Sequence, residues 1–140
     1  MRHDLVTDCD RLAAMPYDSG HAASLAGVDI DKINVAAATL ACNDAIARYP
    51  EVTRFVFEAG RVATARKDHA EARRLYDKAA AEGYAMAMNN IGAIYEGGEG
   101  VPVNYTEAVR WYGKAVASGE PIAMVTSAGS MKKGTAWRGI

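Results

Sequence analysis

The chain has 140 residues, of which half are hydrophobic and 24% are charged, so it can form one globular domain with a core of its own. Its 16 basic and 17 acidic residues give a net charge of −1. The chain therefore lacks the excess of positive charge that binding to a nucleic acid backbone requires. No apolar run approaches the roughly 20 residues of a membrane span, and we expect no targeting segment at the start of this sequence.

The first 33 residues are predicted to form an N-terminal arm. A short helix is expected near Cys9–Met15, where Pro16 stops it. Residues 17–31 are rich in glycine, serine, aspartate and alanine and show no periodicity, so we expect an extended segment there.

The two cysteines, Cys9 and Cys42, lie too far apart in sequence for a redox motif or a tight metal knuckle. They are either two small buried residues or one disulfide that ties the arm to the first long helix. The sequence leaves both interpretations open. A disulfide would indicate a periplasmic or secreted protein, and free thiols would indicate a cytoplasmic one.

From residue 34 onward the sequence predicts an array of helices that extends to residue 119. Residues 34–50 are expected to form one helix, and residues 54–83 a pair of helices with a turn near Lys67 and with Asp68 as the N-cap of the second helix. The predicted buried positions are Ala38, Cys42 and Ala45, then Val56, Ala59 and Ala63, then Ala72, Leu75, Tyr76 and Ala79.

Residues 85–119 predict a second pair of helices. The glycine-rich turn GGEGV ends the first helix, Asn104 caps the next one, and Gly119 ends it. Residues 120–140 begin like a third pair but have no partner helix, so we expect a capping helix, or the stub of a longer array, and a tail.

The two pairs are copies of one repeat. Ala72, Tyr76, Ala79 and Gly83 recur 36 residues later as Ala108, Tyr112, Ala115 and Gly119, and Gly60 recurs as Gly92. Small residues allow two antiparallel helices to approach closely, so we expect the helices to cross at Gly92 and Ala108. Tyr95 and Tyr112 are expected to fill the space beside that crossing, and Trp111 to pack in the core.

Residues 85–119 resemble the Sel-one-like repeat, a branch of the tetratricopeptide-like α-solenoids. The residues that carry the resemblance are Ala85, Ala87, Gly92, Tyr95, Val101, Ala108, Trp111, Tyr112, Ala115 and Gly119. The resemblance is weaker over residues 54–83, which lack the glycine turn. It implies an all-α solenoid in which the first helix of each pair, here called the first-type helix, lines a concave surface that holds a protein partner. Bacterial members of the family often act as adaptors.

If the first-type helices line such a surface, their exposed faces are the candidate peptide-binding residues. These are Arg54, Phe57, Glu58 and Arg61 in the first copy and Met86, Asn89, Asn90, Ala93 and Glu96 in the second. Asparagine is unfavourable within a helix, and its amide can bind a peptide backbone or else tie neighbouring repeats together. The two arginines can attract an acidic peptide or belong to a solvated face that Glu58 partly neutralises.

No catalytic or cofactor motif is present in the sequence. His3, His21 and His69 are scattered, and no nucleophile elbow or phosphate-binding loop occurs. We therefore expect a non-enzymatic protein- or peptide-binding adaptor that needs no cofactor and binds neither nucleic acid nor membrane. The alternatives are a structural module that forms homo-oligomers through its last repeat and, third, an unrecognised hydrolase.

Overall fold

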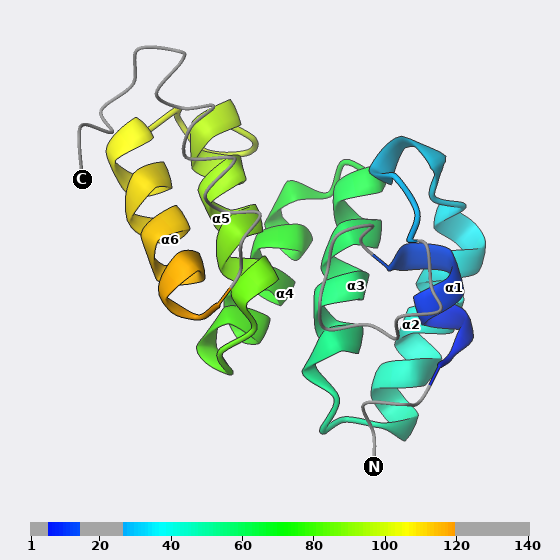
Figure 1. The fold of residues 1–140 in the computed structure, drawn as a ribbon. Coiled ribbons are helices and arrows are strands. Elements are labelled where there is room, and N and C mark those ends of the chain that lie inside the picture. Colours follow the sequence, from blue (N-terminus) through cyan, green and yellow to red (C-terminus); the bar gives the residue numbers. More distant parts are fainter. Residues whose placement is uncertain (1–5, 15–26, 120–140) are drawn as a thin grey trace. The chain divides into compact units, whose positions relative to one another are not determined.

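The computed structural model describes residues 6–14 and 27–119, and these residues contain α-helices and one 3₁₀ helix but no strand, which confirms the predicted all-α fold. The predictions for residues 15–26 and 120–140, including the capping helix, lie outside this part. The helices are α1 (Asp8–Ala13), α2 (Val35–Arg48), α3 (Thr53–Ala65), α4 (His69–Ala81), α5 (Ala85–Gly97) and α6 (Tyr105–Ala117), with the 3₁₀ helix η1 (Ile30–Lys32) before α2 (Figure 1). The chain divides into two compact units, residues 1–82 and 83–140.

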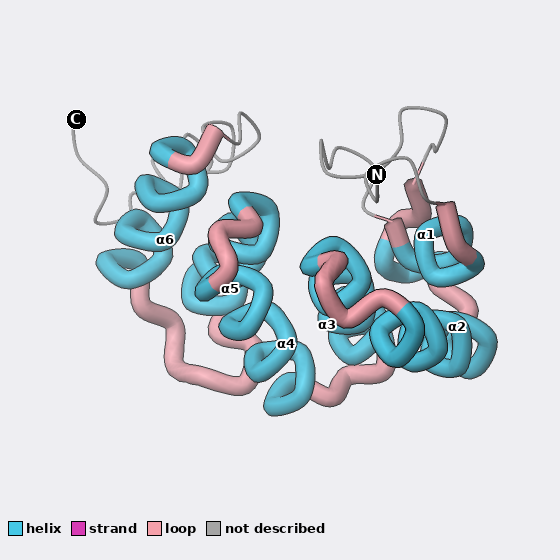
Figure 2. The backbone as a smooth tube through the Cα atoms, turned by 90° about the horizontal axis from the view of Figure 1, so that it is seen from below, coloured by secondary structure: helices cyan, strands magenta, loops and turns pink. Residues whose placement is uncertain are grey.

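The first unit is built around α3, which packs against α4 on one side and against α1 and α2 on the other (Figure 2). Ten consecutive residues of α3, from Arg54 to Ala63, are buried. The side chain of Asp68 accepts a hydrogen bond from the backbone N–H of Glu71 and caps α4 as predicted. Because α3 is buried on every side, it has a neighbour on every side, and α1 is one of these neighbours.

The second unit is the antiparallel pair α5 and α6. Gly98 ends α5 in the left-handed conformation, with a φ of 68°, which glycine adopts without the steric cost that a side chain adds. The turn then returns to α5, because the backbone N–H of Asn104 donates to the carbonyl of Tyr95 over 2.9 Å. The side chain of Asn104 caps α6 by accepting from the N–H of Glu107 over 3.1 Å.

Both helix pairs cross in the same way, at a glycine that lies against a tyrosine ring. A Cβ added at Gly60 would lie 2.6 Å from the ring of Tyr76, and one added at Gly92 would lie 2.6 Å from the ring of Tyr112 and 3.1 Å from the carbonyl of Ala108. The predicted crossing at Gly92 and Ala108 is therefore confirmed.

The disulfide occupies the corresponding place in a third pair, α1 and α2. Cys9 and Cys42 are joined with a Cα–Cα distance of 4.5 Å, and both are buried. Cys42 follows Asn34, the N-cap of α2, at the same distance along the chain as Tyr76 follows Asp68, the N-cap of α4. The short helix α1 thus pairs with α2 as α3 pairs with α4, and a covalent bond replaces the contact between glycine and tyrosine.

Candidate functional site

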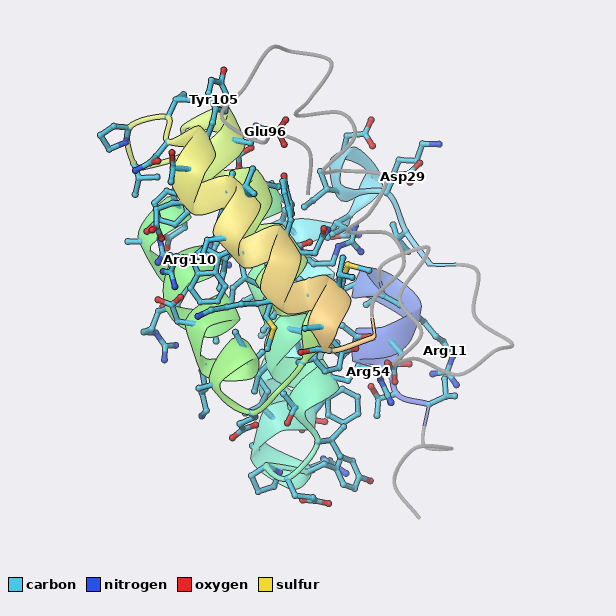
Figure 3. The ribbon with its side chains drawn as sticks, turned by 60° about the vertical axis from the view of Figure 1, so that its left-hand side comes forward. Arg11, Asp29, Arg54, Glu96, Tyr105 and Arg110 are labelled. Carbon is cyan, nitrogen blue, oxygen red and sulfur yellow. A yellow bond between two sulfur atoms is a disulfide. The ribbon has the colours of Figure 1, made fainter. Side chains whose placement is uncertain are left out.

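The first candidate surface is the polar stripe of α3 formed by Arg54, Glu58 and Arg61, which the helical periodicity places on one face. Arg54 makes a bidentate ion pair with Asp10 of α1, with Nε–Oδ1 and Nη2–Oδ2 distances of 2.7 and 3.1 Å. The side chains are 4% and 0% exposed, so this pair lies inside the unit. Figure 3 shows Arg54 beside α1. Residues 6–14 therefore lie against the stripe.

Arg61 holds the backbone of the same N-terminal segment. Its guanidinium donates to the carbonyl oxygens of Ala13 and Ala14 over 2.8 and 2.7 Å, and to that of Val28 over 2.7 Å. The last carbonyls of a helix have no partner within the helix, and a cation at this end is favourable. Arg61 thus caps the C-terminus of α1.

Two carboxylates share the surroundings of Arg54. Oε2 of the fully buried Glu58 lies 3.9 Å from Nε of Arg54, the same nitrogen that binds Asp10. Burial by itself raises the pKa of Asp10, but hydrogen bonds, with that of Arg54 the largest, outweigh it and hold the pKa below its ordinary value of 3.8. Asp10 is therefore charged at neutral pH.

The prediction that Arg54, Phe57, Glu58 and Arg61 lie on an exposed face is wrong, because all four are at least 96% buried. The two arginines lie under the N-terminal segment, and the ring of Phe57 packs against Tyr76 with 5.7 Å between centroids. The sequence interpretation overlooked Asp10. Its signal was the capping box Thr7–Asp10, which predicts a helix start at α1 and so a folded element able to cover α3.

The second candidate surface, here named the α5 face, consists of Asn89, Asn90, Ala93 and Glu96. Ala93 is exposed at its centre, Asn90 and Glu96 are half-buried, and Asn89 is 5% exposed. The prediction that Met86 and Asn89 are exposed on this helix is wrong, because their exposed fractions are 1% and 5%. Asn90 and Ala93 lie on the side of α5 away from Gly92, which packs against α6. Asn89 and Glu96, three residues before Gly92 and four after it, lie between these two sides.

The polar groups of the α5 face differ in their hydrogen bonds. The amide nitrogen of Asn89 donates only a long bond of 3.7 Å to the sulfur of Met86, and its buried carbonyl oxygen accepts none. The side chain of Asn90 makes no hydrogen bond to any described residue. Glu96 accepts a bond of 2.6 Å from the hydroxyl of Tyr112, which joins α5 to α6.

The aromatic residues predicted to be structural differ in burial. Tyr76 and Tyr112 are buried, and Tyr95 and Trp111 are half-buried. The indole ring of Trp111 lies beneath the cationic groups of Arg110 and Lys114 on α6, at 5.6 and 4.4 Å from its centroid. Trp111 is thus only partly in the core.

Among the described residues, no three histidine, cysteine or acidic side chains gather as metal ligands would. His69 stands at the first position of α4, and the other two histidines lie outside the described part. No described helix is long and apolar enough to cross a membrane.

Comparison with known proteins agrees with the helix pairs. A family model described as Sel1 repeat matches residues 57–84 and 85–120. The first match covers most of α3 and all of α4, and the second covers α5 and α6. No curated protein and no solved structure matches the sequence significantly.

Proposed function

Because residues 57–120 of this chain are two Sel1 repeats, which are generally protein-interaction modules, we propose that the protein is a non-enzymatic adaptor for a protein or peptide partner. The proposal rests on the α5 face, where Asn90 presents an amide without a hydrogen-bond partner among the described residues. An amide both donates and accepts, so it can bind the backbone of an extended segment whatever its sequence.

The surroundings of Asn90 support this assignment. The exposed Ala93 stands one helical turn away, and its small side chain leaves room for a peptide backbone to approach the helix. Asn89 lies beside Asn90, but its carbonyl oxygen is buried, so Asn90 presents the accessible amide.

The first unit offers a related contact within the chain itself. Arg61, on the other first-type helix, binds three backbone carbonyls of the N-terminal segment, which is a contact that no particular sequence is needed to form. Of the residues predicted to bind a peptide, Arg54 and Arg61 thus hold the N-terminal segment of the same chain, and Phe57 packs against Tyr76. We assign the contact with an external partner to the α5 face, where Asn90, Ala93 and Glu96 are the accessible residues.

The experiment is a pull-down with the full chain and two variants of the α5 face. Asn90→Ala removes the amide, and Ala93→Arg blocks the face without removing any contact that the fold uses. Both are expected to lose a partner that the wild-type protein retains, with unchanged melting. Thr106→Ala, at an exposed position of α6, is the control. Equal retention by both variants would refute the proposed surface.

One observation favours the second function, a self-assembling module. Tyr105 and Val116 of α6, the last described helix, are exposed large hydrophobic residues, at 36% and 39%. A second copy of the chain can cover such a surface. Concentration-dependent dimers in light scattering that disappear in Val116→Lys would favour assembly over adaptor function.

The disulfide supports an oxidising compartment, the periplasm or the cell exterior, as the location that we propose. Cys9 and Cys42 are both in the bond, and no free cysteine remains among the described residues. Mass spectrometry after alkylation of the protein from its native source tests this location, and two free thiols would contradict it.

A further inference from the structure

A cleft of about 260 Å³ lies in the first unit between α2 and α4, with α3 as its floor. Ala59, Val62 and Leu75 give it an apolar lining, and Thr39 and Asn43 stand on the α2 side. Pockets for drug-sized ligands usually measure roughly 300–1,000 Å³. The cleft is below that range and has the dimensions of a site for a single side chain.

The second repeat shows which side chain this position accepts. With the 36-residue repeat, Leu75 of the cleft corresponds to Trp111. At that position in the second unit the chain itself places an indole ring, and Lys114 and Arg110 cover its face. Leu75 in the first unit places no aromatic ring at the position where Trp111 places one.

The charged residues around the indole ring are nevertheless present in both repeats. Glu107, Arg110 and Lys114 correspond to Glu71, Arg74 and Lys78, which stand at the same intervals before and after Leu75. The ion pair is also the same, since Arg74 binds Glu71 through two hydrogen bonds of 2.8 and 2.7 Å, and Arg110 binds Glu107 through two of 3.1 and 2.9 Å.

The first repeat therefore has Arg74 and Lys78 as counterparts of the two cations, but no ring at the position of Leu75. Lys78 is exposed, and Arg66 lines the cleft from the end of α3, where it is 37% exposed. A cation over an aromatic face contributes about 0.5–2 kcal/mol, more as the site is desolvated. An aliphatic side chain that entered the cleft would gain burial but not this attraction.

We propose that the cleft between α2 and α4 binds one aromatic side chain of a partner protein, with tryptophan as the best fit. The ring would lie on Leu75 and Val62, and Lys78 and Arg66 would face it from the rim. The cleft shares no residue with the α5 face. This second interaction surface therefore goes beyond the proposed function, and an experiment on it does not test the α5 face.

The test uses the full chain in its disulfide form, labelled with ¹⁵N, and N-acetyl-L-tryptophanamide as the probe. Weak, saturable changes in chemical shift are expected at the amides of Thr39, Val62 and Leu75. N-acetyl-L-leucinamide, the matched control probe, is expected to give changes several-fold smaller at the same concentration. Equal changes with both probes, or changes scattered over the surface, would overturn the proposal.

Two variants close the cleft from opposite sides. Leu75→Trp places the chain's own ring there, as Trp111 does in the second repeat, and Asn43→Trp covers the cleft from an exposed position of α2. Each is expected to abolish the changes caused by the probe, so the test survives if one variant fails to fold. Persistent changes in either folded variant would contradict the assignment.

Removal of the cation gives the third readout. Lys78→Ala is expected to weaken binding of the tryptophan probe several-fold and to leave the response to the leucine probe unchanged. Lys32→Ala, at an exposed lysine of η1, is the matched control and is expected to bind both probes as the wild type does. A loss of equal size with both probes would show that no cation–π contact forms.

Discussion

Gly92 of α5 and Tyr112 of α6 are in such close contact that a single added carbon on the glycine would lie 2.6 Å from the tyrosine ring. The same ring donates its hydroxyl proton to Glu96, one helical turn beyond the glycine, over 2.6 Å. The tyrosine thus fills the space that the glycine leaves and is fixed at its polar end. This contact sets the distance between the two helices.

Gly92→Ala is expected to destabilise the protein by about 1–3 kcal/mol, because the added methyl group must displace the ring of Tyr112. Gly113→Ala is the control, since a Cβ at this exposed position of α6 meets nothing within 4 Å. The control is expected to stabilise by roughly 0.5–1 kcal/mol through helix propensity alone. Urea denaturation measures both, and two stabilised variants would refute the crossing.

The protein is expected to lose stability above about pH 10 because of Tyr112. Burial, followed by the neighbouring Glu96, raises the pKa of Tyr112 well above its ordinary value of 10.0. The unfolded chain releases this proton first, so the free energy of unfolding decreases as the pH rises. Tyr112→Phe should make the decrease between pH 9 and 11 smaller by about 1–2 kcal/mol. Tyr105→Phe, at an exposed tyrosine, should not.

Asp10→Ala is expected to destabilise the first unit by about 3–5 kcal/mol at pH 7, because Arg54 then stays buried without this carboxylate. Asp8→Ala should have little effect, since its ion pair with Arg11 is exposed.

The pH dependence gives a second measurement on the same residue. The pKa of Asp10 is lowered in the folded protein, so its contribution to stability is complete above about pH 4 and is lost as the pH falls further. Wild-type protein should therefore lose more stability than Asp10→Ala between pH 5 and 3. Parallel curves for the two proteins would show that the ion pair does not contribute.

Reduction of the disulfide is expected to cost about 2–4 kcal/mol, because the bond closes a loop between residues 33 positions apart. A helix of six residues is not stable alone, so hydrogen exchange in α1 should accelerate first. The amides of α5 and α6 are the internal control and should keep their protection. Equal acceleration in both units would contradict a local role of the bond.

The sequence by itself determined the repeat, the helix pairs and their crossings. These features depend on contacts that recur at fixed intervals along the chain. The spacing of Gly92 and Tyr112 was therefore enough to predict that the two residues are in contact. The caps Asp68 and Asn104 were equally readable, because an N-cap acts on residues three positions further along the chain.

For the cysteines the sequence left two interpretations, and only the structure chose between them. Cys9 and Cys42 are separated by a segment without periodicity, so no interval relates one to the other. The same reason made the cleft beside Leu75 invisible in the sequence. A cleft is the space that three helices leave between them, and no single helix encodes it.

Only the tertiary structure decided which polar residues are available to a partner. The stripe of Arg54 and Arg61 has the sequence pattern of a solvated helix face, yet it lies under a segment whose Asp10 is 44 positions away along the chain. A charge can be buried when an opposite charge and backbone carbonyls meet it. Such partners come from distant parts of the chain, and helical periodicity reports only on neighbours within one helix.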